Sequence, residues 1–189
     1  MKIVKAALVA LVLAFVSGAA WADDDADTVQ LFKNAGQSAS FFSKSYGYAV
    51  FPTVGKAGLV VGGARGDGNV YVKGKAIGSA TVTQLSVGLQ AGGQAYSEII
   101  FFQDKRALNE FTSGNFEFGA GVNAIAITAA AGASTGTTGS GAGASGGKKD
   151  AATAGSFHKG MAVFTIAKGG LMYEASVSGQ KFKYKAAGK

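Results

Sequence analysis

The amino-acid sequence predicts an α+β fold, in which a strongly bent or barrel-like antiparallel sheet carries an N-terminal helix and one short inserted helix. Three observations lead to this prediction. Apolar side chains recur every three or four positions between residues 25 and 46, which is the helical period. From residue 48 onward, apolar side chains mostly alternate with polar or small ones, as in half-buried strands. Many of the 30 glycines lie inside these strand segments, which is typical of sheets that bend sharply or close.

The first 22 residues contain the three parts of a secretory signal peptide. Lys2 and Lys5 are basic, residues 6–16 are apolar, and Ala20-Trp21-Ala22 has the small-x-small pattern of a cleavage site. The apolar run is shorter than the roughly 20 residues that a membrane-spanning helix needs. We therefore expect cleavage after Ala22 and a periplasmic or secreted protein. The sequence has no cysteine, so we do not expect a lipoprotein.

Residues 23–189 have the length of a single domain. Without cysteine this domain has no disulfide framework and no thiol nucleophile. The whole-chain net charge is +7, and without Lys2 and Lys5 it is +5. A basic balance favours an anionic partner. For an exported protein we expect lipid headgroups rather than nucleic acid. For a net charge of +5 taken alone, however, ordinary solubility is the favoured explanation.

The segment from residue 25 to residue 46 is predicted to be an amphipathic helix. Phe32 and Phe42 share its apolar face, Phe41 widens that face, and Lys33 and Lys44 lie off it. In one interpretation the aromatic rings enter a membrane interface while the lysines meet phosphates. In the other, the apolar face covers the sheet. The second interpretation is favoured, because most amphipathic helices are core elements.

The period-two segments are predicted to be strands. Proline cannot donate to a sheet ladder, so Pro52 is expected to end the first of them. The glycines and Asp67 in residues 63–68 are typical of a hairpin turn. The strands expected in this half of the chain are residues 48–51, 57–62, 69–73, 80–88 and 95–103.

Asp104 is predicted to cap a short helix over residues 105–113. Ala107, Leu108 and Phe111 would face inward, and Gly114 would close the helix. Residues 134–154 are rich in Gly, Ser, Thr and Ala, and we expect them to form a mobile low-complexity loop. The remaining strands are expected at residues 116–130, 161–167, 171–177 and 181–184.

A second feature is a set of lysines on predicted strands. Lys181, Lys183 and Lys185 alternate with Phe182 and Tyr184, so the three ammonium groups share one face of an edge strand. Lys73 and Lys75 are assigned to the same basic set. This set could form a patch that faces anions. Equally, lysine on an edge strand prevents edge-to-edge aggregation, and the sequence does not decide between these two explanations.

No catalytic or metal-binding pattern stands out. His158 is the only histidine, and it has no second histidine or cysteine with which to hold a transition metal. Gly147-Lys148 is followed by Lys149 where a phosphate-binding loop requires Ser or Thr. The acidic residues between Asp67 and Glu174 are scattered singly. We therefore predict that the protein is not an enzyme and has neither a cofactor nor a metal site.

Several blocks of the sequence follow one another in a characteristic order. They are Tyr46-Gly47-Tyr48-Ala49-Val50-Phe51-Pro52, Lys56-Ala57-Gly58-Leu59-Val60-Val61-Gly62-Gly63, Gly66-Asp67-Gly68, Val87-Gly88-Leu89-Gln90-Ala91-Gly92-Gly93-Gln94, Ile99-Ile100-Phe101-Phe102, the predicted helix from Asp104 to Gly114, Lys168-Gly169-Gly170-Leu171 and Ser178-Gly179. This series of blocks resembles the SYLF lipid-binding domain family. The resemblance implies what eukaryotic members do, which is to bind phosphoinositides and acidic lipids with an amphipathic N-terminal helix and basic residues taking part. Some of those members also bind actin.

The expected function is therefore non-enzymatic lipid binding in the cell envelope, with anionic phospholipid or a membrane surface as the partner. The alternative is a structural or self-associating interaction protein of the envelope, and the oligomeric state is left open. An integral outer-membrane barrel is disfavoured, because the predicted strands are not evenly repeated segments of about ten residues. The residues expected to contact lipid are Phe32, Lys33, Phe41, Phe42, Lys44, Lys73, Lys75, Lys181, Lys183 and Lys185.

Overall fold

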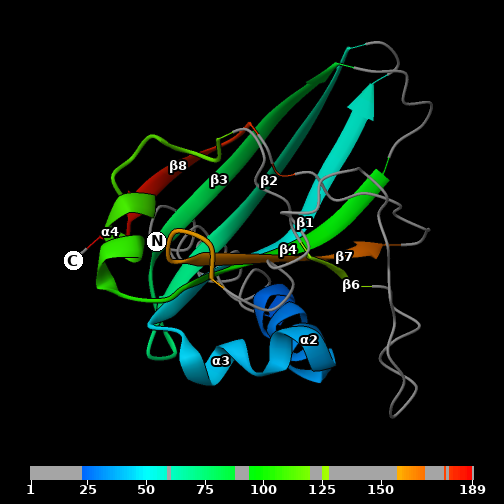
Figure 1. The fold of residues 1–189 in the computed structure, drawn as a ribbon. Coiled ribbons are helices and arrows are strands. Elements are labelled where there is room, and N and C mark those ends of the chain that lie inside the picture. Colours follow the sequence, from blue (N-terminus) through cyan, green and yellow to red (C-terminus); the bar gives the residue numbers. More distant parts are fainter. Residues whose placement is uncertain are drawn as a thin grey trace, which may run out of the picture.

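The fold is built on one eight-stranded sheet, seen here in a computed structural model (Figure 1). The structure describes residues 23–58, 61–87, 94–119, 125–127, 157–168, 177 and 179–188. The strand order is β5-β8-β3-β2-β1-β4-β7-β6, and neighbouring strands are antiparallel except for the parallel pair β6 and β7. The strands are β1 (Gly47–Gly58), β2 (Val61–Val72), β3 (Lys75–Val87), β4 (Gln94–Phe102), β5 (Phe116–Glu117), β6 (Ile125–Ile127), β7 (Met161–Lys168) and β8 (Gln180–Ala186).

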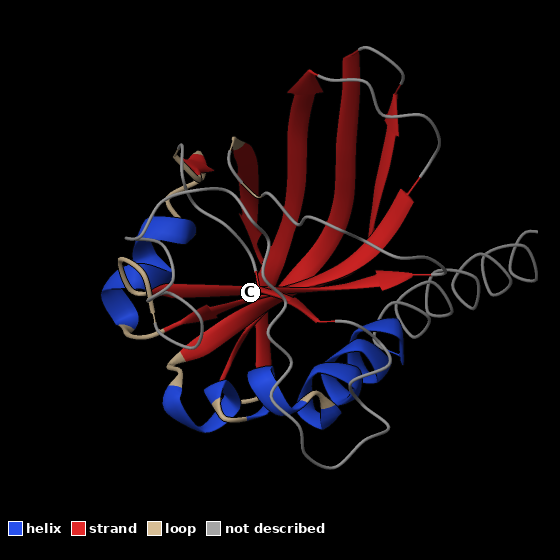
Figure 2. Ribbon diagram, turned by 45° about the vertical axis from the view of Figure 1, so that its right-hand side comes forward, coloured by secondary structure: helices blue, strands red, loops and turns tan. Residues whose placement is uncertain are grey.

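The sheet curls so strongly that strands far apart in its order come into contact. Three strands separate β8 from β4, yet Gln180 Nε2 of β8 lies 3.2 Å from the Tyr96 hydroxyl and 2.9 Å from Glu98 Oε2 of β4. The strands accordingly fan out and change direction from one side of the sheet to the other (Figure 2). The predicted strongly bent sheet in an α+β fold is therefore confirmed.

The two faces of the sheet bury separate apolar clusters. The inner face holds the larger cluster, which includes Phe51, Phe102 and Phe182, and α4 (Lys105–Phe111) packs onto it through Phe111. The outer face of β1, β4 and β7 is covered by the N-terminal helices. Their cluster unites Phe32 and Phe41 with the sheet residues Val50, Ile99, Phe101, Ala162, Phe164 and Ile166.

Pro52 does not end the first strand, contrary to the sequence prediction. β1 continues to Gly58, and the pairing register with β2 shifts between Val50 and Thr53. This β-bulge accommodates a proline on a strand that has neighbours on both sides. The Pro52 carbonyl instead accepts a hydrogen bond of 2.8 Å from Ser97 Oγ.

The glycines predicted to form a hairpin turn at residues 63–68 lie inside β2, so that prediction is wrong. They are needed for close approach rather than for positive φ. A Cβ on Gly66 would lie 2.8 Å from the Thr53 carbonyl oxygen, and one on Gly68 would collide with the Val50 carbonyl and lie 2.7 Å from the Phe51 ring. Both glycines thus face the bulge of β1.

The hairpin turn between β2 and β3 lies farther along the chain, at Lys73-Gly74. These two residues have φ values of 50° and 76°, as expected for a tight turn of two residues. The predicted strands 69–73 and 80–88 belong to β2 and β3, except that Lys73 is in the turn and residue 88 lies outside the described residues. The strand predicted at 57–62 is instead the end of β1 and the start of β2, and residues 59–60 are not described.

The predicted N-terminal helix is not continuous. Helical residues 23–34 are followed by α2 (Gly36–Ala39) and α3 (Phe41–Lys44). The break is at Ala35, whose φ of −84° and ψ of 110° are extended. The Ser38 hydroxyl stabilises it by donating to the Phe32 carbonyl at 2.6 Å. Because of this break, Phe32 and Phe41 both reach the sheet.

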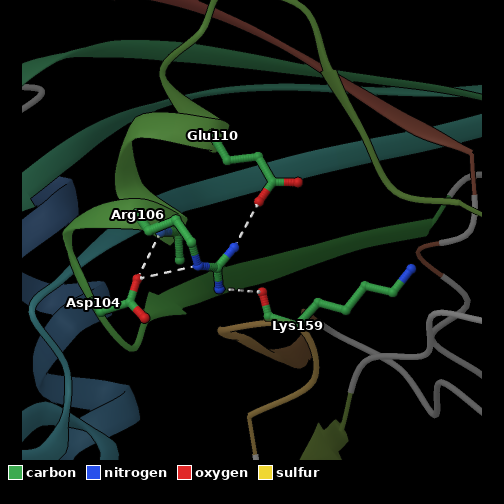
Figure 3. A network of polar contacts seen from close by, with 5 residues as sticks. Asp104, Arg106, Glu110 and Lys159 are labelled. Carbon is green, nitrogen blue, oxygen red and sulfur yellow. Dashed lines mark hydrogen bonds and ion pairs between the residues drawn. The ribbon is translucent and has the colours of Figure 1, made fainter.

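The short inserted helix α4 confirms its prediction. The Asp104 side chain caps it by accepting a hydrogen bond of 2.8 Å from the Ala107 amide, and Gly114 follows with a φ of 106°. Figure 3 shows how Arg106 ties α4 to the turn before β7. Its guanidinium lies 3.2 Å from Glu110 Oε2 and donates to the Lys159 carbonyl at 3.3 Å.

The other predicted elements have mixed outcomes. The predicted strands 95–103, 161–167 and 181–184 correspond to β4, β7 and β8 within a few residues. Of the predicted strand 116–130, only β5 and β6 are strands among its described residues. The predicted loop 134–154 and residues 171–176 of another predicted strand lie outside the described residues, and Val177 is not in a strand.

Candidate functional site: the outer face of the sheet

The aromatic residues predicted to contact lipid lie against the sheet. Phe32 and Phe41 are buried, and Phe42 is partly buried. The Phe41 ring centroid is 4.9 Å from that of Phe164, and Phe42 makes an edge contact of 4.9 Å with Phe101. Burying a phenylalanine side chain contributes about 1.5–3 kcal/mol, so these rings hold the helices on the sheet. The favoured interpretation of the helix, as a cover for the sheet, agrees with this packing.

A polar contact fixes the start of the first helix to β2. The Asp25 carboxylate is buried and accepts hydrogen bonds from Asn69 Nδ2 at 2.7 Å and from the Tyr71 hydroxyl at 2.6 Å. Burial, and then the bond to Asp25, raises the pKa of Tyr71. Sequence reasoning missed this contact, since Asn69 and Tyr71 lie 44 and 46 positions after Asp25 in the chain.

The strongest basic feature is the outer face of β8, which carries Lys181, Lys183 and Lys185. All three lysines are exposed, while Phe182 points into the core on the opposite side. The pairing registers align each lysine with a hydroxyl side chain of β3 and a polar residue of β2. These rows are Arg65–Thr83–Lys181, Asp67–Thr81–Lys183 and Asn69–Ser79–Lys185. We call the exposed surface formed by these three lysines, Ser79, Thr81 and Thr83 the lysine face.

The lysine face is only partly neutralised. Lys181 Nζ lies 3.6 Å from Glu117 of β5, and Asp67 accepts from Thr81 Oγ1 at 2.7 Å while facing Arg65 at 3.9 Å. Lys183 and Lys185 form no ion pair with any residue in the described part of the chain. Two ammonium groups are therefore available to an anion on this face. On its outer edge, β8 pairs with β5 only at Lys181 and Phe182. The rest of this edge of β8, which includes Lys183 and Lys185, has no neighbouring strand among the described residues.

The other predicted basic residues do not join the lysine face. Lys73 occupies the β2–β3 turn and Lys75 opens β3, four positions before Ser79, which corresponds to roughly 13 Å along a strand. Lys33 and Lys44 are exposed on the N-terminal helices, and Lys33 Nζ lies 5.6 Å from the centroid of the Phe42 ring. The structure thus divides the predicted basic residues into three separate places.

A polar cluster inside the curled sheet was also missed by sequence reasoning. Glu98 is fully buried and accepts from Gln180 Nε2 at 2.9 Å. Burial raises the pKa of Glu98 to about 7, although the bond from Gln180 partly opposes this increase. Tyr96 receives a second bond from Gln180 at 3.2 Å, and burial raises its pKa as well. Thr165 of β7 pairs directly with Glu98 in the ladder and is also buried.

The described residues offer little for catalysis or metal binding. His158 is exposed next to the turn before β7. Within the described ranges, no three His, Cys, Asp or Glu side chains gather where they could hold a metal ion. In the same part of the chain, none of the helices combines the length and apolar character needed to cross a membrane.

Comparisons with known proteins identify relatives of the chain. The model of the Ysc84 family, described as "Las17-binding protein actin regulator", matches residues 83–187, which is more than half of the chain. Beta cell expansion factor A of Aeromonas veronii is 28% identical over 160 residues, covering 84% of this chain and 53% of the relative. The chain therefore spans about half the length of that curated relative. The matched family segment includes β8 with its three lysines.

Proposed function

Since the chain belongs to the Ysc84 (SYLF) family, we propose that it is a non-enzymatic binding domain that docks on anionic membrane lipid through its lysine face. The observation that carries this proposal is the pair of exposed lysines, Lys183 and Lys185, that have no acidic partner among the described residues and lie beside Lys181. A lysine near an anionic membrane surface contributes about 1 kcal/mol. The two lysines without an acidic partner among the described residues therefore contribute about 2 kcal/mol together.

The hydroxyl side chains of β3 support the same proposal in part. Ser79, Thr81 and Thr83 stand beside the lysines on the neighbouring strand. Thr81 already donates its proton to Asp67, and Thr83 donates to the Lys181 carbonyl. The Ser79 hydroxyl, beside Lys185, is therefore the one that can join the ammonium groups in donating to a phosphate oxygen. Sheet hydrogen bonds hold these side chains at fixed spacing, and the face is therefore already arranged before lipid arrives.

The N-terminal helices are proposed to play a secondary part. Lys33 and Lys44 are exposed and can meet headgroups while the helices stay docked. Phe32 and Phe41 could enter lipid only if the helices left the sheet, which would expose their apolar cluster. We place the docking step on the lysines and the exposed Leu31, not on the buried rings.

We also propose that the protein works in the cell envelope, in keeping with the signal peptide expected at residues 1–22. Anionic phospholipid is the partner that suits an exported basic domain. Self-association is the competing function. It would use the edge of β8 for strand pairing, where lysines oppose such contacts.

Vesicle co-sedimentation tests this proposal. The purified protein is mixed with vesicles of neutral choline lipid, or with the same vesicles containing 30% anionic lipid, at low and high salt. We expect binding to the anionic vesicles only, with weaker binding at high salt because counter-ions screen exposed charges. Equal binding to both vesicles, or none to either, contradicts the proposal. Light scattering in the same buffers would then show whether the chain self-associates instead.

A further inference from the structure

The polar cluster inside the sheet has more hydrogen-bonding capacity than the protein uses. Within the described residues, three buried oxygens have no hydrogen-bond partner: Glu98 Oε1, Thr165 Oγ1 and Gln180 Oε1. All three side chains are at most 1% exposed. Leaving a buried polar atom without a partner costs about 1–3 kcal/mol, and native structures contain few such atoms. Three together indicate a site that something else completes.

These three oxygens belong to one place in the fold. Gln180 reaches across the interior to bond Glu98, so their unpartnered oxygens are carried by two side chains in direct contact. Thr165 is the ladder partner of Glu98 in the antiparallel pair β4 and β7, where facing side chains have their Cβ atoms about 5 Å apart. Tyr96 also contacts Gln180, and its hydroxyl accepts that bond, which leaves its own proton free to donate.

The charge of the site is also incomplete. No Lys, Arg or His is among the buried side chains of the described residues, so Glu98 has no cationic partner in the interior. The groups around it are the amide of Gln180, the hydroxyls of Tyr96 and Thr165, and, farther along β3, the buried amide of Gln84, which pairs with Gln180 in the ladder. All of these groups are uncharged at neutral pH.

We propose that this interior cluster binds a single primary ammonium group, with Glu98 as its counter-charge. A primary ammonium has three N–H donors and no acceptor, which matches the three unpartnered oxygens. It also supplies the one positive charge that the buried carboxylate lacks. A quaternary ammonium has the charge without the donors, so it leaves the three oxygens unpartnered. An alkali cation can be coordinated by such oxygens, and it is therefore the competitor that the test has to separate from an ammonium group. The ammonium group can come from a free amine or from the headgroup of an ethanolamine lipid.

This inference is independent of docking through the lysine face. The lysine face lies on the outer side of β8, whereas Gln180 points to the inner side. Because burial raises the pKa of Glu98 to about 7, binding of an ammonium group should depend on pH. Below that pH the carboxyl keeps its proton and competes with the ammonium, so binding strengthens as the pH rises through 7.

The test uses thermal unfolding and calorimetric titration of the purified protein at pH 8, in buffer free of primary amines. Ethanolamine is compared with equal concentrations of choline and of sodium chloride. We expect ethanolamine to raise the melting temperature by about 3–6 °C at roughly ten times its dissociation constant. Choline and sodium chloride should have no comparable effect, and an equal rise in sodium chloride would overturn the choice of an ammonium ligand. The shift should shrink at pH 5.5. Equal melting temperatures in ethanolamine and choline at pH 8 would mean that the site holds only water, and would overturn the inference.

Two variants locate the response. Glu98→Gln removes the charge and keeps the shape, and it should weaken ethanolamine binding at least tenfold. Thr165→Val removes one acceptor and should weaken it several-fold, whereas Thr83→Val on the outer face should not. Unchanged affinity in both Glu98→Gln and Thr165→Val would place the response elsewhere and refute the site.

Vesicles separate the two sources of the ammonium group. Stronger retention on ethanolamine-lipid vesicles than on choline-lipid vesicles, lost in Glu98→Gln, identifies the headgroup as the ligand. A response to free ethanolamine alone identifies a free amine, and both results support the site. Binding of Glu98→Gln to anionic vesicles without ethanolamine lipid should equal that of the unsubstituted protein, so failure of one proposal leaves the other intact.

Discussion

Replacing Glu98 with glutamine is expected to remove a pH dependence from the stability of the fold. Glu98 is fully buried, and its pKa is raised from 4.5 to about 7, mainly because burial disfavours the charged form. The folded protein therefore holds this proton up to about pH 7, while the unfolded chain releases it near pH 4.5. Between these values unfolding releases a proton, so the free energy of unfolding falls as the pH rises.

The magnitude follows from the same two pKa values. Their difference corresponds to about 3 kcal/mol, lost between about pH 4.5 and 7 and constant above that range. Glutamine imitates the protonated carboxyl and can still accept the bond from Gln180 Nε2. Glu98→Gln should thus match the unsubstituted protein near pH 4.5 and exceed its stability by up to about 3 kcal/mol at pH 8.

The assay is urea unfolding at several pH values between 4.5 and 8, in buffers without primary amines. Other carboxyl groups titrate in this range, so the informative quantity is the difference between variant and unsubstituted protein at each pH. Glu110→Gln on the exposed side of α4 is the matched control and should follow the unsubstituted protein within about 0.5 kcal/mol. If the curve for Glu98→Gln runs parallel to that of the unsubstituted protein, Glu98 is not held protonated by burial.

Two further predictions concern the packing of the outer and inner faces. Asp25→Ala leaves Asn69 and Tyr71 without their acceptor, so we expect a loss of about 2 kcal/mol and faster amide exchange in residues 26–34, measured by mass spectrometry; unchanged exchange would show that the apolar contacts alone hold the helix. Gly68→Ala should cost at least about 2 kcal/mol in urea unfolding, because its Cβ meets Val50 and Phe51, whereas Gly55→Ala meets nothing within 4 Å and should be near neutral. Equal effects of the two substitutions would contradict the close approach of β1 and β2.

The elements that sequence reasoning predicted well are those with local signals. The cap at Asp104, the inward spacing of Ala107, Leu108 and Phe111, and the closing glycine all lie within eleven residues, and α4 forms where they indicate. The alternation in β8 likewise placed its three lysines on one exposed face. In both cases the residues that determine the structure are neighbours in the sequence.

The errors arose where the same residue type serves two purposes. Gly66 and Gly68 were assigned to a turn, but they permit β1 to approach closely at its bulge, and the sequence does not distinguish these roles. Pro52 ends strands in most contexts and is accommodated here only because the bulge removes the need for its amide. Ala35 has no residue-level signal that would predict an extended backbone within a helical pattern.

Contacts over long sequence separations were beyond sequence reasoning. The bond between Gln180 and Glu98 joins residues 82 positions apart, and it exists only because the sheet curls. Alternation places Glu98 on the same face as Tyr96 and Ile100, but the sequence does not show that β8 closes over this face and buries the carboxyl. The contact of Asp25 with β2 has the same character. Both therefore had to come from the structure.

The most direct test of docking through the lysine face is the affinity of Lys183→Glu/Lys185→Glu for anionic vesicles. These lysines have no ion pair within the described residues, so their reversal removes the attraction without breaking a recorded contact. The control Lys105→Glu/Lys159→Glu makes the same change in net charge at exposed positions on α4 and the turn before β7. We predict at least a tenfold loss of affinity for the first variant. For the control, the fold-loss of affinity should be less than half as large. Equal losses would mean that net charge, and not this face, directs binding to the membrane.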